Sequence, residues 1–407
     1  MSRQRCSAIH WKRVVLLFFL GWALIYANRI VFSAVLTEIA LEWRLSKTEL
    51  GLLSSAFFMA YTLGQVPTGF LADKFSKRVL LLPGYYLQGA AAAASGMVGS
   101  SAAFLLARVL AGAGQSTYYA SQYALAALYV PREKRAQGAA VINAGMAGGV
   151  LIGLMAGSIA VFHLGLNWRV PMVVLGVASV ALGLCIHLFV AETPRPTGDS
   201  RQNDTAMQPK VRQNPLGTRD FWLMWFTALG TQYSLYLVLT WLPFYLQEAR
   251  GLTGSAAGVA SSLMPLLAAP SGIAAGWLSD RFGTRRKILV TLVPCSLVAL
   301  ALIGFSKTYA MLYIGLALYG ITGKLTIDPL IVAAVQDISG DQGRASALGV
   351  LNFASTVSMV AAPAVTGYLV DVTGSFSSAF WVAILLAGVS SVAVSLTREQ
   401  RATLREN

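Results

Sequence analysis

Long apolar blocks, separated by short polar breaks, run along almost the whole chain. About 20 apolar residues in a helix cross the hydrocarbon core of a bilayer, and a helix closes its own backbone hydrogen bonds there. Barrel strands would instead alternate in hydrophobicity over runs of about ten residues. The pattern therefore predicts an all-α polytopic membrane protein with twelve transmembrane helices. We expect them near residues 14–38, 48–72, 79–99, 101–129, 136–161, 169–190, 220–247, 253–279, 288–306, 308–336, 344–371 and 376–397.

Charged residues are few and gather in one set of loops. Of the 407 residues, 56% are hydrophobic and 12% are charged, about half the charged fraction of a soluble protein. Lysine and arginine concentrate in the even-numbered loops and in both tails. The net charge of +14 therefore reflects membrane orientation rather than nucleic-acid binding. The positive-inside rule predicts a multi-pass plasma (inner) membrane protein with both termini in the cytoplasm.

A polar, proline-rich stretch divides the chain into two similar parts. We expect a six-helix bundle at 1–190, a cytoplasmic linker at 191–219 and a second six-helix bundle at 220–407. The segment at 69–78 returns in the second part as the segment at 276–285. Parallel repeats of six helices are typical of transporters whose binding site lies between the halves.

These repeats resemble the major facilitator superfamily over nearly the whole chain. Its best-known loop motif, G-x-L-[A/S]-D-[R/K]-x-G-[R/K]-[R/K], recurs in both copies, with Ser76 in place of the usual glycine. Arg108 with Gly112 and Gly114 matches a second motif. The resemblance implies two pseudo-symmetric bundles, a monomer, and a cytoplasmic gate that holds one conformation. The gate residues would be Asp73, Lys74, Arg78, Asp280 and Arg281.

Four ionisable residues fall well inside the predicted spans: Arg29, Arg108, Lys324 and Asp328. A charged side chain at the centre of a bilayer costs at least about 2.5–3.5 kcal/mol, so it normally faces a protein interior or a watery cavity. Three cations stand against one anion, and uncompensated buried charge is unfavourable. The simplest compensation is a bound substrate that carries a carboxylate or phosphate.

Polar side chains also follow single faces of helices that would line a shared cavity. In helix four, Gln115, Tyr119 and Gln122 lie on one face. The repeat offset that maps Arg135 onto Arg344 also maps Gln115 onto Lys324, so Arg29 and Lys324 come from opposite halves. A substrate held by both cations would draw the halves together. We predict that the substrate-binding residues are Arg29, Lys324, Asn28, Gln115, Tyr119, Tyr233 and Tyr236.

Within the superfamily, the chain is most similar to the anion:cation symporter family, which carries organic anions. The likeness rests on Asn28-Arg29, on Arg108 with Gln115 seven residues later, and on the Trp-Leu-Pro-x-Tyr-Leu run at 241–246. Relatives coupled to protons have acids at the positions of Asn28 and Gln115, and amides cannot titrate. Asp328 or Glu38 could carry the proton instead, or transport is not coupled to protons. Arg108 would support the site or relay charge.

Several features admit a purely structural interpretation. Lys324 could simply pair with Asp328, the tyrosines could be ordinary core aromatics, and Arg108 could bond to backbone carbonyls. Small residues every four positions allow close helix approach in lipid. Such a ridge in helix five, which consists of Gly145, Gly149, Gly153 and Gly157, could serve static packing or sliding.

The sequence favours a secondary active transporter of small organic anions, either monocarboxylates or dicarboxylates. Its partners would be the anion, membrane lipid and, as a candidate coupling ion, protons. One alternative is an exporter of amphiphilic metabolites, drugs or lipids, and another is a transporter-like ligand sensor. The cysteines and histidines show no metal-ligand spacing, and no catalytic constellation or cofactor motif is visible, so we predict neither an enzyme nor a cofactor.

Overall fold

The computed structural model describes residues 2–131, 134–190, 215–283 and 285–398, and these residues contain no strand. The helices are α1 (Ser2–Ala34), α2 (Leu36–Trp43), α3 (Lys47–Lys74), α4 (Lys77–Ser95), α5 (Ser101–Gln115), α6 (Tyr118–Tyr129), α7 (Arg135–Ser158), η2 (Ile159–His163), α8 (Arg169–Phe189), η3 (Pro215–Gly217), α9 (Arg219–Glu248), α10 (Gly254–Phe282), α11 (Arg285–Phe305), α12 (Tyr309–Thr322), α13 (Lys324–Thr373) and α14 (Phe376–Leu396).

Local sequence explains where many of these helices begin. A helix leaves its first backbone N–H groups without partners, and a serine or threonine just before it can accept a hydrogen bond from one of them. Such caps are Ser46 before α3, Ser76 before α4, Ser100 before α5, Thr218 before α9, Thr253 before α10, Thr308 before α12 and Ser375 before α14.

The helices form the twelve predicted spans, but three spans are interrupted. The first span consists of α1 and α2 and is interrupted at Val35. The fourth consists of α5 and α6 and is interrupted at Ser116 and Thr117. The tenth consists of α12 and the start of α13 and is interrupted at Gly323. Among the described residues, eight stretches are long and apolar enough, by length and composition alone, to cross a membrane. The second, third, fourth and seventh predicted spans are not among these eight, because they are more polar or interrupted.

The element α13 contains the rest of the tenth span and the whole eleventh. Asp337 forms an ion pair with Arg285, the first residue of α11. Asp371, in contrast, contacts the first residues of α3. Because these contacts lie at opposite ends of the molecule, α13 turns back on itself. We call the end where α1 begins and α14 ends the terminal end, and the opposite end the far end.

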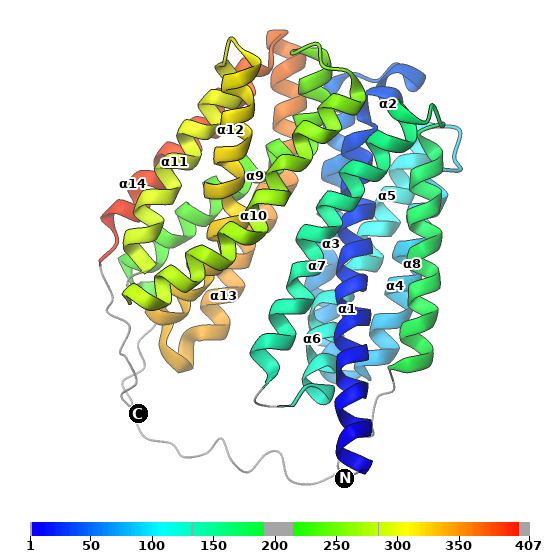
Figure 1. Ribbon diagram of the computed structural model, residues 1–407, viewed down its shortest axis with the longest axis vertical. Helices are drawn as coiled ribbons and strands as arrows, with labels where there is room; N and C mark the ends of the chain where they lie inside the picture. The colour runs from blue at the N-terminus through cyan, green and yellow to red at the C-terminus, as the bar shows by residue number, and fades with distance from the viewer. Residues whose placement is uncertain (1, 132–133, 191–214, 284, 399–407) are drawn as a thin grey trace.

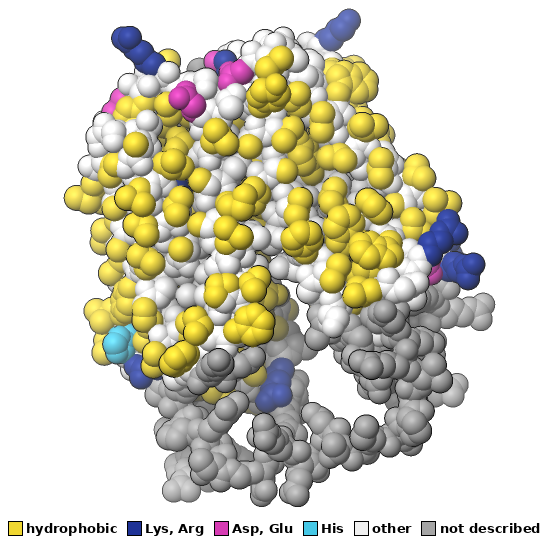
Figure 2. Space-filling view, turned by 180° about the vertical axis from the view of Figure 1, so that it is seen from behind, with side chains coloured by type: hydrophobic (Ala, Val, Ile, Leu, Met, Phe, Trp, Pro, Cys, Tyr) yellow, Lys and Arg dark blue, Asp and Glu magenta, His cyan; other side chains and the backbone are white. Residues whose placement is uncertain are grey.

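Figure 1 shows two bundles side by side, α1 to α8 in one and α9 to α14 in the other. The bundles approach each other at the far end, near α2, and diverge toward the terminal end. In Figure 2, hydrophobic side chains cover the flanks, charged side chains lie near the two ends, and the surface divides into two lobes at the terminal end. The predicted linker at 191–219 lies outside the described residues except for 215–219.

Hydrogen bonds and an ion pair join the two halves at the far end. The Ser33 hydroxyl donates to the carbonyl oxygens of Leu239 (2.6 Å) and Thr240 (2.5 Å). The Ser55 hydroxyl donates to the Val360 carbonyl oxygen at 2.6 Å. The Lys47 ammonium lies 3.3 Å from a Glu248 carboxylate oxygen. These contacts close the seam between the halves on this side.

Two glycines allow α3 and α13 to approach each other closely across this seam. A Cβ atom added to Gly51 of α3 would lie 2.4 Å from the Pro363 carbonyl oxygen of α13. A Cβ atom added to Gly367 of α13 would lie 2.1 Å from the Lys47 carbonyl oxygen of α3. Both obstacles are backbone atoms, so the two helices can meet this closely only because neither glycine has a side chain.

The glycine ridge of the fifth span packs within one half. Cβ atoms added to Gly145, Gly149 and Gly153 would lie 2.3 Å, 2.3 Å and 2.7 Å from carbonyl oxygens of α1. The matching face of α13 packs against α9, where the Ser358 hydroxyl donates to the Leu229 carbonyl oxygen at 2.8 Å. The ridge therefore packs α7 against α1 within the first half.

Asp371 caps the start of α3 from the other half. Its carboxylate accepts hydrogen bonds from the backbone N–H groups of Lys47 (3.1 Å) and Thr48 (2.7 Å) and from the Thr48 hydroxyl (2.6 Å). The carboxylate thus helps to hold the seam closed.

We expect Asp371→Asn to lower the thermal unfolding midpoint at neutral pH. The substitution replaces one carboxylate oxygen, which accepts hydrogen bonds from α3, by an NH2 group that cannot accept them. Asp371 is exposed, so the effect is at most about 1 kcal/mol. Thermal unfolding of wild type and variant at neutral pH checks this. Equal unfolding midpoints for the two proteins contradict it.

Candidate functional site

Arg29 lies in the last two turns of α1, is 5% exposed and points toward the other half. Its Nε donates to the Gln115 Oε1 at 3.1 Å, and its Nη1 donates to the Tyr236 hydroxyl at 3.4 Å. Gln115 ends α5 in the same half, whereas Tyr236 belongs to α9 in the second half. The guanidinium group therefore sits where the two halves meet, as the repeat pattern predicts.

Aromatic rings surround the Arg29 guanidinium. Its Cζ lies 4.8 Å from the ring centroids of Tyr26 and Tyr61, 5.5 Å from that of Phe57 and 5.6 Å from that of Phe58. Ring faces attract a cation but leave its charge uncancelled. No carboxylate of the described residues lies within 4 Å of the guanidinium. The arrangement can accept an anion without first breaking an ion pair.

Lys324 occupies the position that matches Gln115 in the repeat, and both residues lie at helix breaks. Gln115 is the last residue of α5, and Lys324 is the first residue of α13. The Gln115 Nε2 has no hydrogen-bond partner among the described residues. Gly323, before α13, supplies no side-chain cap to the first N–H groups of that helix. Breaks of this kind at mid-membrane place polar backbone and side chains where a substrate can use them.

The Lys324 ammonium is paired with Asp328, one turn later on the same helix. Nζ lies 2.6 Å from the Asp328 carboxylate, and the two side chains are 2% and 51% exposed. A buried cation is thus covered by a half-exposed carboxylate. We call the space between the two lobes, seen at the terminal end in Figure 2, the passage.

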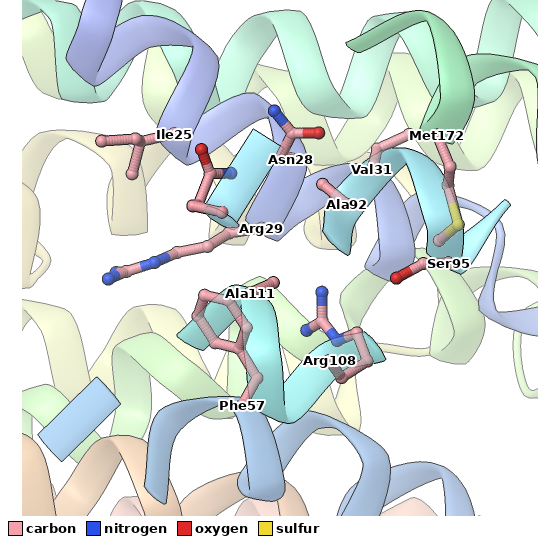
Figure 3. A pocket seen from close by; sticks show the side chains of 11 residues that line it. Ile25, Asn28, Arg29, Val31, Phe57, Ala92, Ser95, Arg108, Ala111 and Met172 are labelled. Atoms are coloured by element: carbon pink, nitrogen blue, oxygen red, sulfur yellow. The ribbon is translucent and has the colours of Figure 1, made fainter. Parts of the chain in front are cut away.

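Arg108 lines a small cavity within the first half, and Asn28 and Arg29 line the same cavity. The cavity has a volume of about 10 Å³, room for about one water molecule. The Arg108 Cζ lies 4.6 Å from the ring centroids of both Phe32 and Phe57, and its Nε has no partner among the described residues. Figure 3 shows the Arg29 guanidinium extending away from Arg108. Arg108 therefore lies behind Arg29, on the side away from its guanidinium, and its role stays a prediction.

Two other predicted substrate ligands also face the interior of their own half. The Asn28 Nδ2 donates to the Ser179 hydroxyl of α8 at 2.9 Å and to the Leu24 carbonyl oxygen at 2.8 Å. Tyr233 is 5% exposed and lies beside Thr366 of α13. Glu38, proposed above as a proton carrier, lies half-buried in α2 at the far end. The structure thus brings Arg29, Gln115 and Tyr236 into direct contact and leaves Asn28 and Tyr233 outside that cluster.

The gate predicted from the loop motif is described only in part. The side chains of Asp73, Lys74 and Asp280 lie outside the described residues. Arg78 donates to the His187 carbonyl oxygen of α8, and the Arg281 Cζ lies 5.1 Å from the Trp277 ring centroid. The gate therefore stays a prediction.

Sequence reasoning missed the aromatic residues around Arg29. Tyr26 precedes Arg29 by three residues and so lies on the same side of α1. Phe58 and Tyr61 share a face of α3 by the same spacing, and the Phe58 ring packs edge-on against Tyr236 of the other half, with centroids 4.9 Å apart. The spacing was a usable signal for Tyr26.

A large apolar groove lies elsewhere on the molecule. It has a volume of about 640 Å³, and its lining comes only from α9, α11 and α14, including Phe226, Leu297 and Trp381. All three helices belong to the second half, so the groove does not lie between the halves and does not include Arg29. Among the described residues there is also no group of three His, Cys, Asp or Glu side chains that could hold a metal ion.

Comparison with known proteins gives relatives that span nearly the whole chain. The chain is 29% identical to the hexuronate transporter of Bacillus subtilis over 94% of its length and 93% of the relative's. It is 29% identical to a probable sulfoacetate transporter of Cupriavidus necator, covering 90% and 89% of the two chains. It is 26% identical to a probable L-galactonate transporter of Escherichia coli, covering 96% and 89%.

The fold also matches solved structures of a bacterial homologue of the human lysosomal transporter Spinster. The TM-scores are 0.76 for the inward-facing occupied structure and 0.78 for the inward-facing unoccupied one, each at 17% identity and over 95% of this chain. The sequence profile of the Major Facilitator Superfamily matches residues 17–323 and 251–407. The chain thus belongs to the Major Facilitator Superfamily and is an integral membrane transporter, not an enzyme.

Proposed function

We propose that this protein carries small organic anions across the membrane, and that Arg29 binds their anionic group. The observation that carries the proposal is the state of Arg29. The side chain is buried where the halves meet and contacts Gln115 of one half and Tyr236 of the other. No carboxylate of the described residues lies within 4 Å of it. A substrate carboxylate or sulfonate would supply the missing charge and form strong charge-assisted hydrogen bonds.

The groups near Arg29 suit a substrate that carries hydroxyl groups as well as an acid. Tyr26, Tyr61, Tyr236 and Gln115 all present a hydroxyl or an amide beside the guanidinium. The relatives named for hexuronate and L-galactonate handle such hydroxylated carboxylates, and the one named for sulfoacetate handles an anion with both a carboxylate and a sulfonate. We therefore place sugar acids first among the candidate substrates.

Alternating access follows from the same contacts. The seam is closed at the far end, and the halves diverge toward the terminal end (Figure 1). The excess of lysine and arginine in the loops at the terminal end favours a cytoplasmic position for that end. In this conformation the site would be reached from the cytoplasm, and transport would require opening the far-end seam. An exporter of amphiphiles is less well supported, because the large apolar groove lies outside the passage.

A thermal-shift screen on detergent-purified protein tests the proposal. The panel contains D-glucuronate, D-galactonate, sulfoacetate, a neutral hexose and a hydrophobic amine. A ligand that binds only the folded state raises the free energy of unfolding by mass action, by about 2.7 kcal/mol at 100 times Kd. The unfolding midpoint rises with it. We expect at least one of the three anions to stabilise wild type and not Arg29→Ala. Stabilisation by the amine alone, equal in both proteins, would favour the exporter.

A further inference from the structure

Asp328 is the one carboxylate that the sequence places well inside a membrane span. Other acids of the described helices lie near the two ends of the molecule. Glu49 is in the first turn of α3, and Glu248 is the last residue of α9. Asp337 lies where α13 reaches the terminal end of the molecule and pairs with Arg285. The polar residues beside Arg29 in sequence and in space include Asn28 and Gln115, which are amides and cannot titrate. Any proton that moves with the substrate through the middle of this protein must therefore use another group.

Among the described residues, Asp328 forms an ion pair with Lys324 alone. The elements packed against α13 are α3, α9, α10, α11, α12, α14 and η3. Away from their ends, these elements carry only weakly acidic groups, namely Tyr61, Tyr233, Tyr236, Tyr245, Tyr313, Tyr319 and Cys295. The contact that defines the position of the Asp328 carboxylate is therefore the one with Lys324.

Lys324 requires an anion at all times, since its side chain is 2% exposed and a buried ammonium without a counter-charge is strongly unfavourable. Asp328 meets this need in the structure, at 2.6 Å. Asp328 is itself 51% exposed and lies one turn from Lys324 toward the terminal end. It can therefore swing into water without leaving a buried cavity behind.

We infer that Asp328 is an internal substitute for the substrate's anionic group at Lys324, and that substrate binding displaces it and makes it take up a proton. This inference rests on the proposed function. Two carboxylates compete for one ammonium, and the displaced one, beside a second negative charge, favours its neutral form. The proton comes from water on the side to which Asp328 is open. It returns to water when Asp328 recovers Lys324 and the substrate leaves.

The exchange couples transport of the anion to the proton gradient. When protons are more concentrated outside, substrate and proton enter together from that side. On the inside, Asp328 loses its proton and recovers Lys324, and the anion is released. A singly charged anion then crosses with one proton and without net charge. Binding and proton uptake are linked, so lowering the pH tightens binding, by up to about tenfold per pH unit while Asp328 is the group that titrates.

The test is isothermal titration calorimetry on full-length protein. The ligand is whichever of D-glucuronate, D-galactonate and sulfoacetate binds wild type most tightly. Titration in two buffers with different heats of ionisation gives the number of protons taken up. We expect about one proton for wild type near neutral pH and none for Asp328→Asn. The Kd of Asp328→Asn should not change with pH and should be lower than that of wild type at alkaline pH, because the internal competitor is gone.

Three further proteins make the result decisive. Asp328→Glu should keep proton uptake, and Asp337→Asn, on the same helix but at the terminal end, should match wild type. If Asp328→Asn does not fold, the double variant Lys324→Gln with Asp328→Asn, which removes both charges, should bind weakly and without proton uptake. Wild-type proton uptake in Asp328→Asn or in the double variant overturns the inference and leaves the Arg29 proposal intact. Failure of all three anions to bind wild type overturns both.

Discussion

Replacing Arg29 by alanine is expected to weaken binding of the transported anion by at least about 30-fold. Truncating one partner of a buried, hydrogen-bonded charge pair costs about 2–5 kcal/mol, and each 1.4 kcal/mol is about tenfold in Kd. The site offers no substitute on this side of the passage, because Gln115 and Tyr236 are neutral and the Arg29 guanidinium extends away from Arg108. Calorimetric titration of wild type and Arg29→Ala measures the loss.

Two further variants separate charge from geometry. Arg29→Lys keeps the charge but loses the fork that can hold both oxygens of a carboxylate, so its Kd should lie between those of wild type and Arg29→Ala. Arg13→Ala removes an exposed arginine from the terminal end of the same helix and should bind like wild type. Equal Kd values for wild type and Arg29→Ala, with both proteins folded, would show that the anion binds elsewhere.

Adding a methyl group at the glycine seam is expected to slow transport by roughly 5- to 150-fold while leaving the protein folded. In Gly51→Ala and Gly367→Ala, the new Cβ atom meets a backbone carbonyl oxygen of the other half at 2.4 Å and 2.1 Å. Overpacking of this kind costs about 1–3 kcal/mol. Only the conformation closed at the far end carries the clash, so the equilibrium shifts away from it by that amount.

The matched control for the seam is Gly349→Ala, on the same helix α13, where an added Cβ atom has no neighbour within 4 Å. A reporter cysteine at Ser55, in a protein with its native cysteines replaced, reads the opening of the seam through its reaction with a membrane-impermeant maleimide. Labelling should be faster in Gly51→Ala and Gly367→Ala and unchanged in Gly349→Ala. Transport at the wild-type rate in both seam variants would mean that α3 and α13 do not need to meet this closely.

The helices and their repeat were predictable, because hydrophobic length and loop charge report directly on membrane crossing. The same reasoning located Arg29, since an arginine in mid-membrane needs a polar or enclosed environment. It also matched Gln115 with Lys324, and the structure places both at helix breaks. The breaks themselves could not be read from hydropathy, because a broken and a continuous helix have the same apolar content.

Other features depend on which faces meet, and the sequence does not specify that. Neighbouring residues on a helix point about 100° apart, so Asn28 faces α8 when Arg29 faces the passage. That argument was available from the sequence alone. The aromatic residues of α3 around Arg29 were not, because they depend on how α3 packs against α1. The reciprocal glycine contacts of Gly51 and Gly367 likewise join residues more than 300 positions apart.

Counterflow in proteoliposomes tests most directly whether the protein transports organic anions through Arg29. Vesicles loaded with an unlabelled sugar acid are diluted into a trace of the same radiolabelled acid, so that exchange needs no pH gradient. We expect transient accumulation of label in vesicles with wild type, inhibition by other carboxylates, and no accumulation with Arg29→Ala. Accumulation at the wild-type rate with folded Arg29→Ala, or none with wild type for any acid that binds, would contradict the proposed function.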